Sequence, residues 1–237
     1  MKKLIFVPVI HMGADLGSIA EKAAERGISG VGEDIWQRHT KTILGFWQSI
    51  AGYFETFDAK GVKLYQDGMI ADKELGARII EDGIKAGSIN FRILSDLLQR
   101  GAVLVRTEDF KLVKQEHDWF IELSKARTKI EKIIVYLRYI LVKGKLLKKR
   151  DKYVAMRING TLKKNETGVL FIGANHDVER WLDKDIGMVE LKDKKKLIEY
   201  QRGFIHWDRR REKFDKLAGY LTLPVEREKQ SANLRAS

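Results

Sequence analysis

Two histidines stand directly after segments typical of buried β-strands. His11 follows an apolar segment over residues 3–10, and His176 comes shortly after another over residues 168–173. In open parallel sheets, ligands bind at the carboxyl ends of the strands, so these positions are where a site should form. Imidazole nitrogens ligate divalent metals and also act as general acids and bases. The two histidines are therefore candidate ligands, although a histidine after a strand is often a hydrogen-bonded structural residue instead.

A third strand end could bring a carboxylate to the same place. Asp67 follows the short strand expected over residues 61–66. Two imidazoles and one carboxylate with an open coordination position would suit a divalent metal such as manganese, cobalt or zinc. The sequence thus indicates a metal site built from His11, His176 and Asp67.

The elements that would position these residues alternate between strands and helices. This alternation predicts an α/β fold: a mostly parallel sheet with helices on both faces and a helical insertion near residues 108–148. We expect a single domain over residues 1–225 and a polar, frayed tail over 226–237. The expected strands are 3–10, 28–31, 61–66, 102–105, 168–173 and 186–191; the expected helices are 18–26, 34–54, 72–85, 88–101, 107–143, 148–164 and 194–217, with a cap at Thr107 and a break at Gly144.

The positive charge is concentrated in one segment. The chain has 237 residues and a net charge of +12, and residues 125–165 hold fourteen basic residues against two acidic ones. In one interpretation, these cations are the solvated side of a helix that buries its apolar stripe. In the other, they bind a nucleic acid or another anionic surface. The basic residues of the densest part are Lys143, Lys145, Lys148, Lys149, Arg150 and Lys152.

Composition excludes several other classes of function. The chain has no cysteine, which excludes disulfides, thiolate zinc sites and cysteine nucleophiles and fits a reducing, cytoplasmic location. It has only two prolines, which favours long helices over an all-β design. It contains no P-loop, no Gly-x-Gly-x-x-Gly, no Gly-x-Ser-x-Gly and no His-Glu-x-x-His motif. Nucleotide-dependent chemistry, serine hydrolysis and zincin proteolysis therefore lack support.

One pattern resembles a known family. The pair Arg150-Asp151 opens a helical segment, and about twenty residues later a buried strand ends in the turn Gly173-Ala174-Asn175-His176. This arrangement resembles the C-terminal signature of the TraB/GumN/Tiki family, within the erythromycin-esterase/ChaN-like superfamily. Members also have a histidine near the end of the first strand, which His11 matches.

The resemblance implies a metal-dependent hydrolase of a peptide, ester or similar bond. In this interpretation His11 and His176 would ligate the ion, and Asp67 or Glu33 would complete its shell or act as a general base. Arg150 would stabilise negative charge on the reacting group, while Asp151 would orient Arg150 or a histidine. Two alternatives stay open: a non-catalytic ligand-binding or sensing protein on the same fold, and a polyanion binder that uses residues 125–165.

Overall fold

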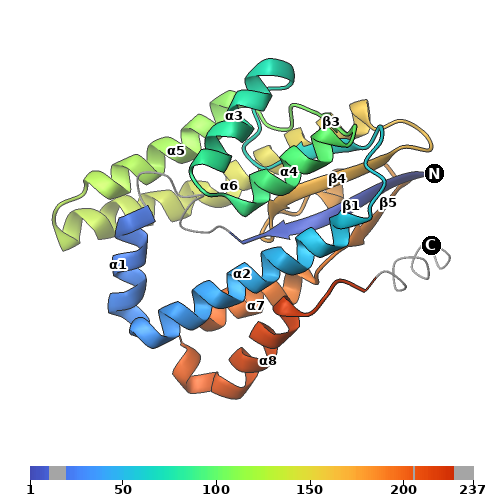
Figure 1. Cartoon of the computed structure of the whole chain (residues 1–237). Helices are drawn as coiled ribbons and strands as arrows, with labels where there is room; N and C mark the ends of the chain where they lie inside the picture. The colour runs from blue at the N-terminus through green and yellow to red at the C-terminus, as the bar shows by residue number, and fades with distance from the viewer. Residues whose placement is uncertain (11–19, 205, 227–237) are drawn as a thin grey trace.

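The α/β prediction is confirmed. The structure is a computed structural model that describes residues 1–10, 20–204 and 206–226, and these residues form a parallel five-stranded sheet between two layers of helices (Figure 1). His11 lies outside the described residues. The strands are β1 (Lys2–Val9), β2 (Lys63–Gln66), β3 (Val103–Leu104), β4 (Thr167–Gly173) and β5 (Ile186–Glu190).

The strand order places three strand ends side by side. It runs β3-β2-β4-β1-β5, and all four pairings are parallel. Val9 at the end of β1 pairs with Gly173, and Gln66 at the end of β2 pairs with Phe171. The carboxyl ends of β1, β2 and β4 therefore meet at one edge of the sheet, as the position of the candidate residues requires.

One face of the sheet carries most of the helices. Alternate β1 side chains such as Ile5 and Val7 pack there against Phe46, Trp47 and other apolar residues from five helices. The indole Nε1 of Trp47 donates to the carbonyl of Ile10 at 3.1 Å, which ties α2 to the end of β1. The helices on this side are α1 (Ala20–Val31), α2 (Glu33–Glu55), α3 (Lys73–Lys85), α4 (Ile89–Gln99), α7 (Lys194–Phe204) and α8 (Arg211–Thr222).

The other face is covered by the second half of one long helix. In α6 (Lys129–Thr161), the side chains of Val154, Ala155 and Ile158 are buried against Leu4 and Phe6 of β1. Segments after β2 and after β4 thus leave the sheet on opposite faces, since α3 and α4 lie on the first face while Val178 joins the second core. Neighbouring strands that diverge in this way open the crevice where α/β proteins bind ligands.

A helical hairpin is inserted between β3 and β4. It consists of α5 (Phe110–Lys125) and the first half of α6, and it projects past the end of β1 (Figure 1). Asp109 caps α5 by accepting from the backbone N–H groups of Lys111 and Leu112. Thr128 and Glu131 cap α6 reciprocally in a capping box. These caps explain why two helices form where the sequence predicted one helix over 107–143.

Several predicted boundaries are wrong for identifiable reasons. Helix α6 runs without a break through Gly144, because tertiary packing of its second half outweighs the modest helix penalty of one glycine. Residues 28–31 belong to α1 and not to a strand. The C-terminal region forms two helices, α7 and α8, with a 3-10 turn between them. No helix of the described residues is long and apolar enough to cross a membrane.

Candidate functional site

Asp67 lies at the tip of a tight turn after β2. The turn is closed by the N–H of Met69, which donates to the carbonyl of Gln66 at 3.0 Å. Gly68 occupies the left-handed region with φ of 73°, where other residues are strained, so a glycine is favoured directly after Asp67. The Asp67 carboxylate accepts from the N–H of Gly173 at 3.2 Å through Oδ2, which joins the ends of β2 and β4.

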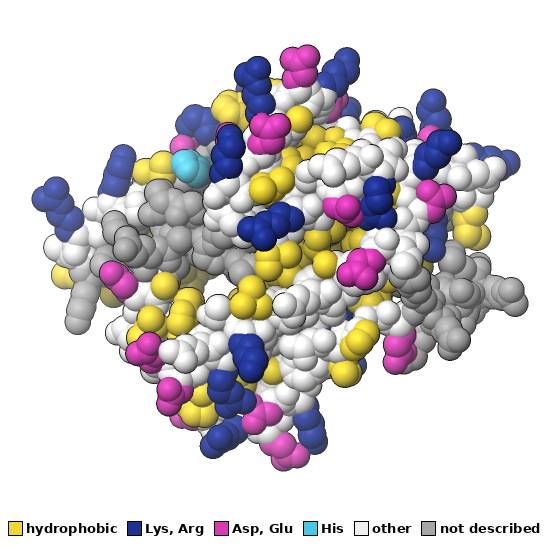
Figure 2. Space-filling view, viewed as in Figure 1, with side chains coloured by type: hydrophobic (Ala, Val, Ile, Leu, Met, Phe, Trp, Pro, Cys, Tyr) yellow, Lys and Arg dark blue, Asp and Glu magenta, His cyan; other side chains and the backbone are white. Residues whose placement is uncertain are grey.

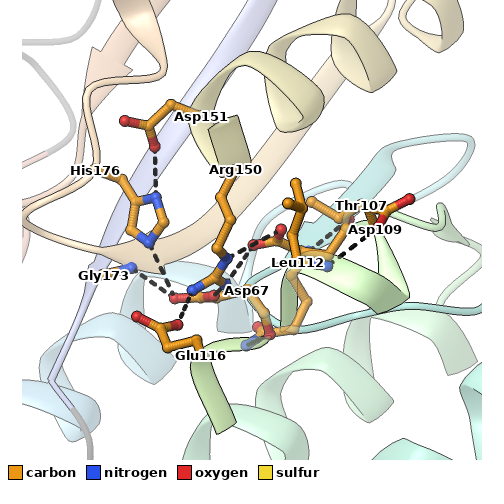
Figure 3. A network of polar contacts seen from close by, with 11 residues as sticks. Asp67, Thr107, Asp109, Leu112, Glu116, Arg150, Asp151, Gly173 and His176 are labelled. Carbon is orange, nitrogen blue, oxygen red and sulfur yellow. Dashed lines mark hydrogen bonds and ion pairs between the residues drawn. The ribbon is translucent and has the colours of Figure 1, made fainter. Parts of the chain in front are cut away.

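His176 is held by a carboxylate from α6. Its Nδ1 lies 2.6 Å from Oδ1 of Asp151, and the second oxygen of Asp151 accepts from the N–H of Asp177 at 3.1 Å. The ring is therefore fixed in orientation, and its other nitrogen, Nε2, faces Oδ2 of Asp67 at 3.8 Å (Figure 3). This arrangement leaves Nε2 and the Asp67 carboxylate directed at one another with a gap longer than a hydrogen bond.

The guanidinium of Arg150 donates hydrogen bonds to three carboxylates from three other parts of the chain. It donates to Glu108 through Nε at 3.3 Å and Nη2 at 2.5 Å, a bidentate pair. Nη2 also donates to Oδ1 of Asp67 at 2.6 Å, and Nη1 donates to Glu116 of α5. Glu108 follows β3, so Arg150 connects two strand ends with the helical hairpin (Figure 3).

Burial makes the electrostatics of this network strong. The side chain of Arg150 is 6% exposed and that of Glu108 is completely buried. Burial raises the pKa of Glu108 to about 7, although the Arg150 charge opposes the shift. Burial alone would lower the pKa of His176, but the hydrogen bond to Asp151 and the charges of Asp67 and Asp151 outweigh it and raise that pKa above its ordinary value. Glu108 can therefore change protonation near neutral pH, while the surrounding carboxylates favour the protonated form of His176.

The site has two donors suited to a divalent metal. Two ligands that each lie about 2.1 Å from one ion are separated by roughly 3–4 Å, depending on the angle between them. The 3.8 Å between Nε2 of His176 and Oδ2 of Asp67 falls within that range. A carboxylate on the far nitrogen of the histidine, as Asp151 provides, is the usual second layer of a metal site. The described residues include no group of three or more His, Cys, Asp or Glu placed to hold an ion.

The structure brings together four of the residues singled out from the sequence. Asp67, Arg150, Asp151 and His176 form one connected network. Glu33, in contrast, begins α2 on the surface, where its carboxylate accepts from the side chain of Gln37. Because Glu33 takes part in none of the contacts of this network, Asp67 is the acid that the fold supports.

Two members of the network were missed by the sequence analysis. Glu108 was placed in the first turn of a helix after Thr107, but the N-cap is Asp109, and Glu108 turns inward onto Arg150. Thr107 instead accepts from the N–H of Gln66 and donates to the carbonyl of Val105, which joins β2 to the end of β3. Glu116 lies inside α5 and carries no sequence signal beyond its charge. The burial of Arg150, which makes carboxylates around it necessary, is a result of the tertiary fold and has no signal in the sequence.

The candidate polyanion-binding lysines lie apart from this network, on the surface of α6. Lys143, Lys145, Lys148, Lys149 and Lys152 are all exposed. Three of them lie over aromatic rings. The ammonium groups of Lys152 and Lys148 are 4.4 Å and 5.8 Å from the ring centroid of Trp181, and that of Lys143 is 5.7 Å from the ring centroid of Tyr139. Acidic and basic side chains are interspersed over the face shown in Figure 2. Residues 125–165, in contrast, hold fourteen basic residues and only two acidic ones.

A comparison with known protein families, with curated proteins and with solved structures finds no match for this chain.

Proposed function

We propose that this chain is a metal-dependent hydrolase of the TraB/Tiki type that cleaves a peptide, ester or similar bond where β2 and β4 end. The observation that carries the proposal is the contact of His176 with Asp151, which directs Nε2 of His176 toward the Asp67 carboxylate. The sequence resemblance around Arg150-Asp151 and His176 supports the same class.

In this proposal Asp67 and His176 hold a divalent ion such as manganese, cobalt or zinc. A divalent ion lowers the pKa of water toward neutrality and polarises the bond to be broken. Asp151 keeps Nδ1 of His176 protonated, so that Nε2 is the free donor, and it prevents rotation of the ring. His11, which comes two residues after the end of β1, is the candidate third ligand from the sequence.

Arg150 has a positioning role in this proposal. The sequence suggested that it stabilises negative charge on the reacting group, but its guanidinium donates to Asp67, Glu108 and Glu116. A guanidinium that donates to three carboxylates holds those groups in place. Because its N–H groups are already used, it is poorly placed to bind a negatively charged substrate group. Glu108, with a pKa of about 7, can take up or release a proton and so adjust the charge of the network.

The same contacts favour a second candidate, a non-catalytic protein that binds a ligand at this site. Arg150 is the arginine that contacts the Asp67 carboxylate, and three carboxylates already pair with its guanidinium. A site whose cation is already paired with carboxylates can bind a metal ion well. It stabilises the negative charge that develops in a transition state less strongly.

Activity in the presence of the ion separates the two candidates. Chelator-treated protein would be supplied with manganese, cobalt or zinc and assayed on a panel of peptides and chromogenic esters. We expect hydrolysis that depends on the ion, is abolished in His176→Ala and Asp67→Asn, and is retained in His206→Ala. His206 is an exposed histidine outside the network and so serves as the matched control.

Binding measured on the same samples gives the alternative outcome. If calorimetry shows that the ion binds to wild type and not to His176→Ala, while no member of the panel is cleaved, the non-catalytic candidate is favoured. If wild type and His176→Ala bind the ion equally, or neither binds it, both candidates are contradicted at this site.

A further inference from the structure

The first half of α6 displays an aliphatic stripe on its surface. In one of the two interpretations of residues 125–165 this apolar stripe is buried, yet each of its side chains is 44–76% exposed. Aliphatic residues at this density are uncommon on a helix that faces only water. The aliphatic stripe consists of Ile130, Ile133, Ile134, Leu137, Ile140 and Leu141.

The aliphatic stripe continues the side of α6 that packs on the sheet. A helix turns by about 100° per residue, so Leu137 and Ile140 lie on the same side as the buried Ala155 and Ile158. The sheet covers that side in the second half of the helix, but the first half extends past the strands (Figure 1). The partner helix α5 lies on a different side of α6, since Trp119 and Phe120 contact the ring of Tyr139.

Exposed cations border the aliphatic stripe. Residues 125–149 contain nine basic residues and a single acidic one, Glu131. On the helix, Arg138 and Lys145 lie along one border of the stripe and Lys143 along the other, and all three are exposed. The first half of α6 is therefore amphipathic, with an aliphatic side and cationic flanks.

This combination favours one kind of partner. A second copy would bring the same cations against each other, which opposes self-association through this face. The phosphates of a nucleic acid would pair with the cations, but a nucleic acid would not bury the six exposed aliphatic side chains. An anionic lipid surface satisfies both features, because the aliphatic side enters the boundary between headgroups and acyl chains while the cations meet the headgroups.

We infer that the hairpin of α5 and α6 docks on an anionic lipid bilayer through the aliphatic stripe and its flanking cations. The inference is independent of the hydrolase proposal, since none of these residues belongs to the network around Arg150.

Vesicle flotation tests this inference on the full chain. We expect wild type to float with phosphatidylcholine–phosphatidylglycerol vesicles and to bind phosphatidylcholine vesicles about tenfold or more weakly. Ile133→Gln combined with Leu137→Gln should lower binding to the anionic vesicles about tenfold or more. The control, Leu75→Gln with Met156→Gln, removes two similarly exposed apolar side chains elsewhere and should bind as wild type does.

A charge variant completes the test. Arg138→Gln with Lys145→Gln should weaken binding to anionic vesicles, whereas Lys60→Gln with Lys184→Gln, at exposed sites outside the hairpin, should not. Circular dichroism would verify that each variant is folded.

Wild type that does not float with anionic vesicles overturns the inference, as does equal flotation of the Ile133/Leu137 variant. Tight binding to an oligonucleotide without flotation would assign the hairpin to nucleic acid, and a dimer lost in the Ile133/Leu137 variant would assign it to a second copy.

Discussion

Asp151 controls the orientation and tautomer of His176. One carboxylate oxygen contacts Nδ1 of the ring and the other accepts the N–H of Asp177. Asp151→Asn keeps the shape of the side chain but removes the charge that holds the proton on Nδ1. Loss of such a second-layer carboxylate typically lowers metal affinity about 10–100-fold, and calorimetry with the chelator-treated protein should show a decrease of this size. Asp177→Asn, at an exposed carboxylate beside the site, should bind the ion as wild type does, and an equal loss there would contradict the role given to Asp151.

His39 makes stability depend on pH far from the site. Its ring stacks on Phe204 with centroids 4.0 Å apart, its Nδ1 lies 2.9 Å from the hydroxyl of Tyr200, and burial lowers its pKa to about 4. The unfolded chain takes up a proton near pH 6.5 and the native chain only near pH 4, so stability falls as the pH decreases through that window. Urea unfolding should show wild type losing at most about 1.4 kcal/mol per pH unit relative to His39→Gln. A constant difference between the two proteins from pH 7.5 to pH 4.5 would rule this out.

At the scale of elements, α6 is continuous through Gly144. A Cβ added at Gly144 would meet nothing within 4 Å, so alanine fits there without strain. Because glycine disfavours a helix interior, Gly144→Ala should stabilise the protein by about 0.5–1 kcal/mol, measured by thermal or urea unfolding. Gly83→Ala is the contrasting variant, since its Cβ would collide with the ring of Phe91 and should destabilise α3. Destabilisation by Gly144→Ala would indicate that α6 breaks there.

The elements were predictable to the extent that their local signals were strong. The two long apolar strands, β1 and β4, have β-branched runs that no helix periodicity competes with, and the prediction is confirmed at both. The segment over 28–31 shows the opposite case, because four residues that include only two apolar ones fit a strand or a helix end equally well, and packing against α2 decides. The exposure of the aliphatic stripe could not be predicted, since periodicity shows that a helix has an apolar side but not where the sheet beneath it ends.

At the scale of the whole molecule, Arg150 joins parts of the chain that are distant in sequence. Its partners come from the end of β2, the segment after β3 and the helix α5. Arg150→Met would leave Glu108 and Asp67 buried without a counter-charge and should cost about 3–5 kcal/mol of unfolding free energy. Glu108→Gln in the same protein should recover part of that loss. Lys149→Met, at the exposed neighbouring position, should change stability by less than about 0.5 kcal/mol, and a similar small effect of Arg150→Met would contradict the network.

The sequence identified the site residues that follow β2 and β4 and the pair Arg150-Asp151 in α6, but it missed Glu108 and Glu116. Asp67 and His176 follow β2 and β4, and the parallel order brings them together. Glu116 reaches the network only because the hairpin folds back over Arg150, a tertiary event without a local signal. Glu33 also follows an apolar segment, but that segment became the end of a helix and not a strand, so nothing carried Glu33 to the sheet edge.

A metal site formed by Asp67 and His176 would be detected in the metal content of the purified, untagged protein. Elemental mass spectrometry would be applied to wild type, His176→Ala and His206→Ala after dialysis against manganese, cobalt or zinc. We expect close to one ion per chain in wild type and in His206→Ala, and none in His176→Ala. Wild type that holds no ion after dialysis, or His176→Ala that holds as much as wild type, would contradict a metal site at Asp67 and His176.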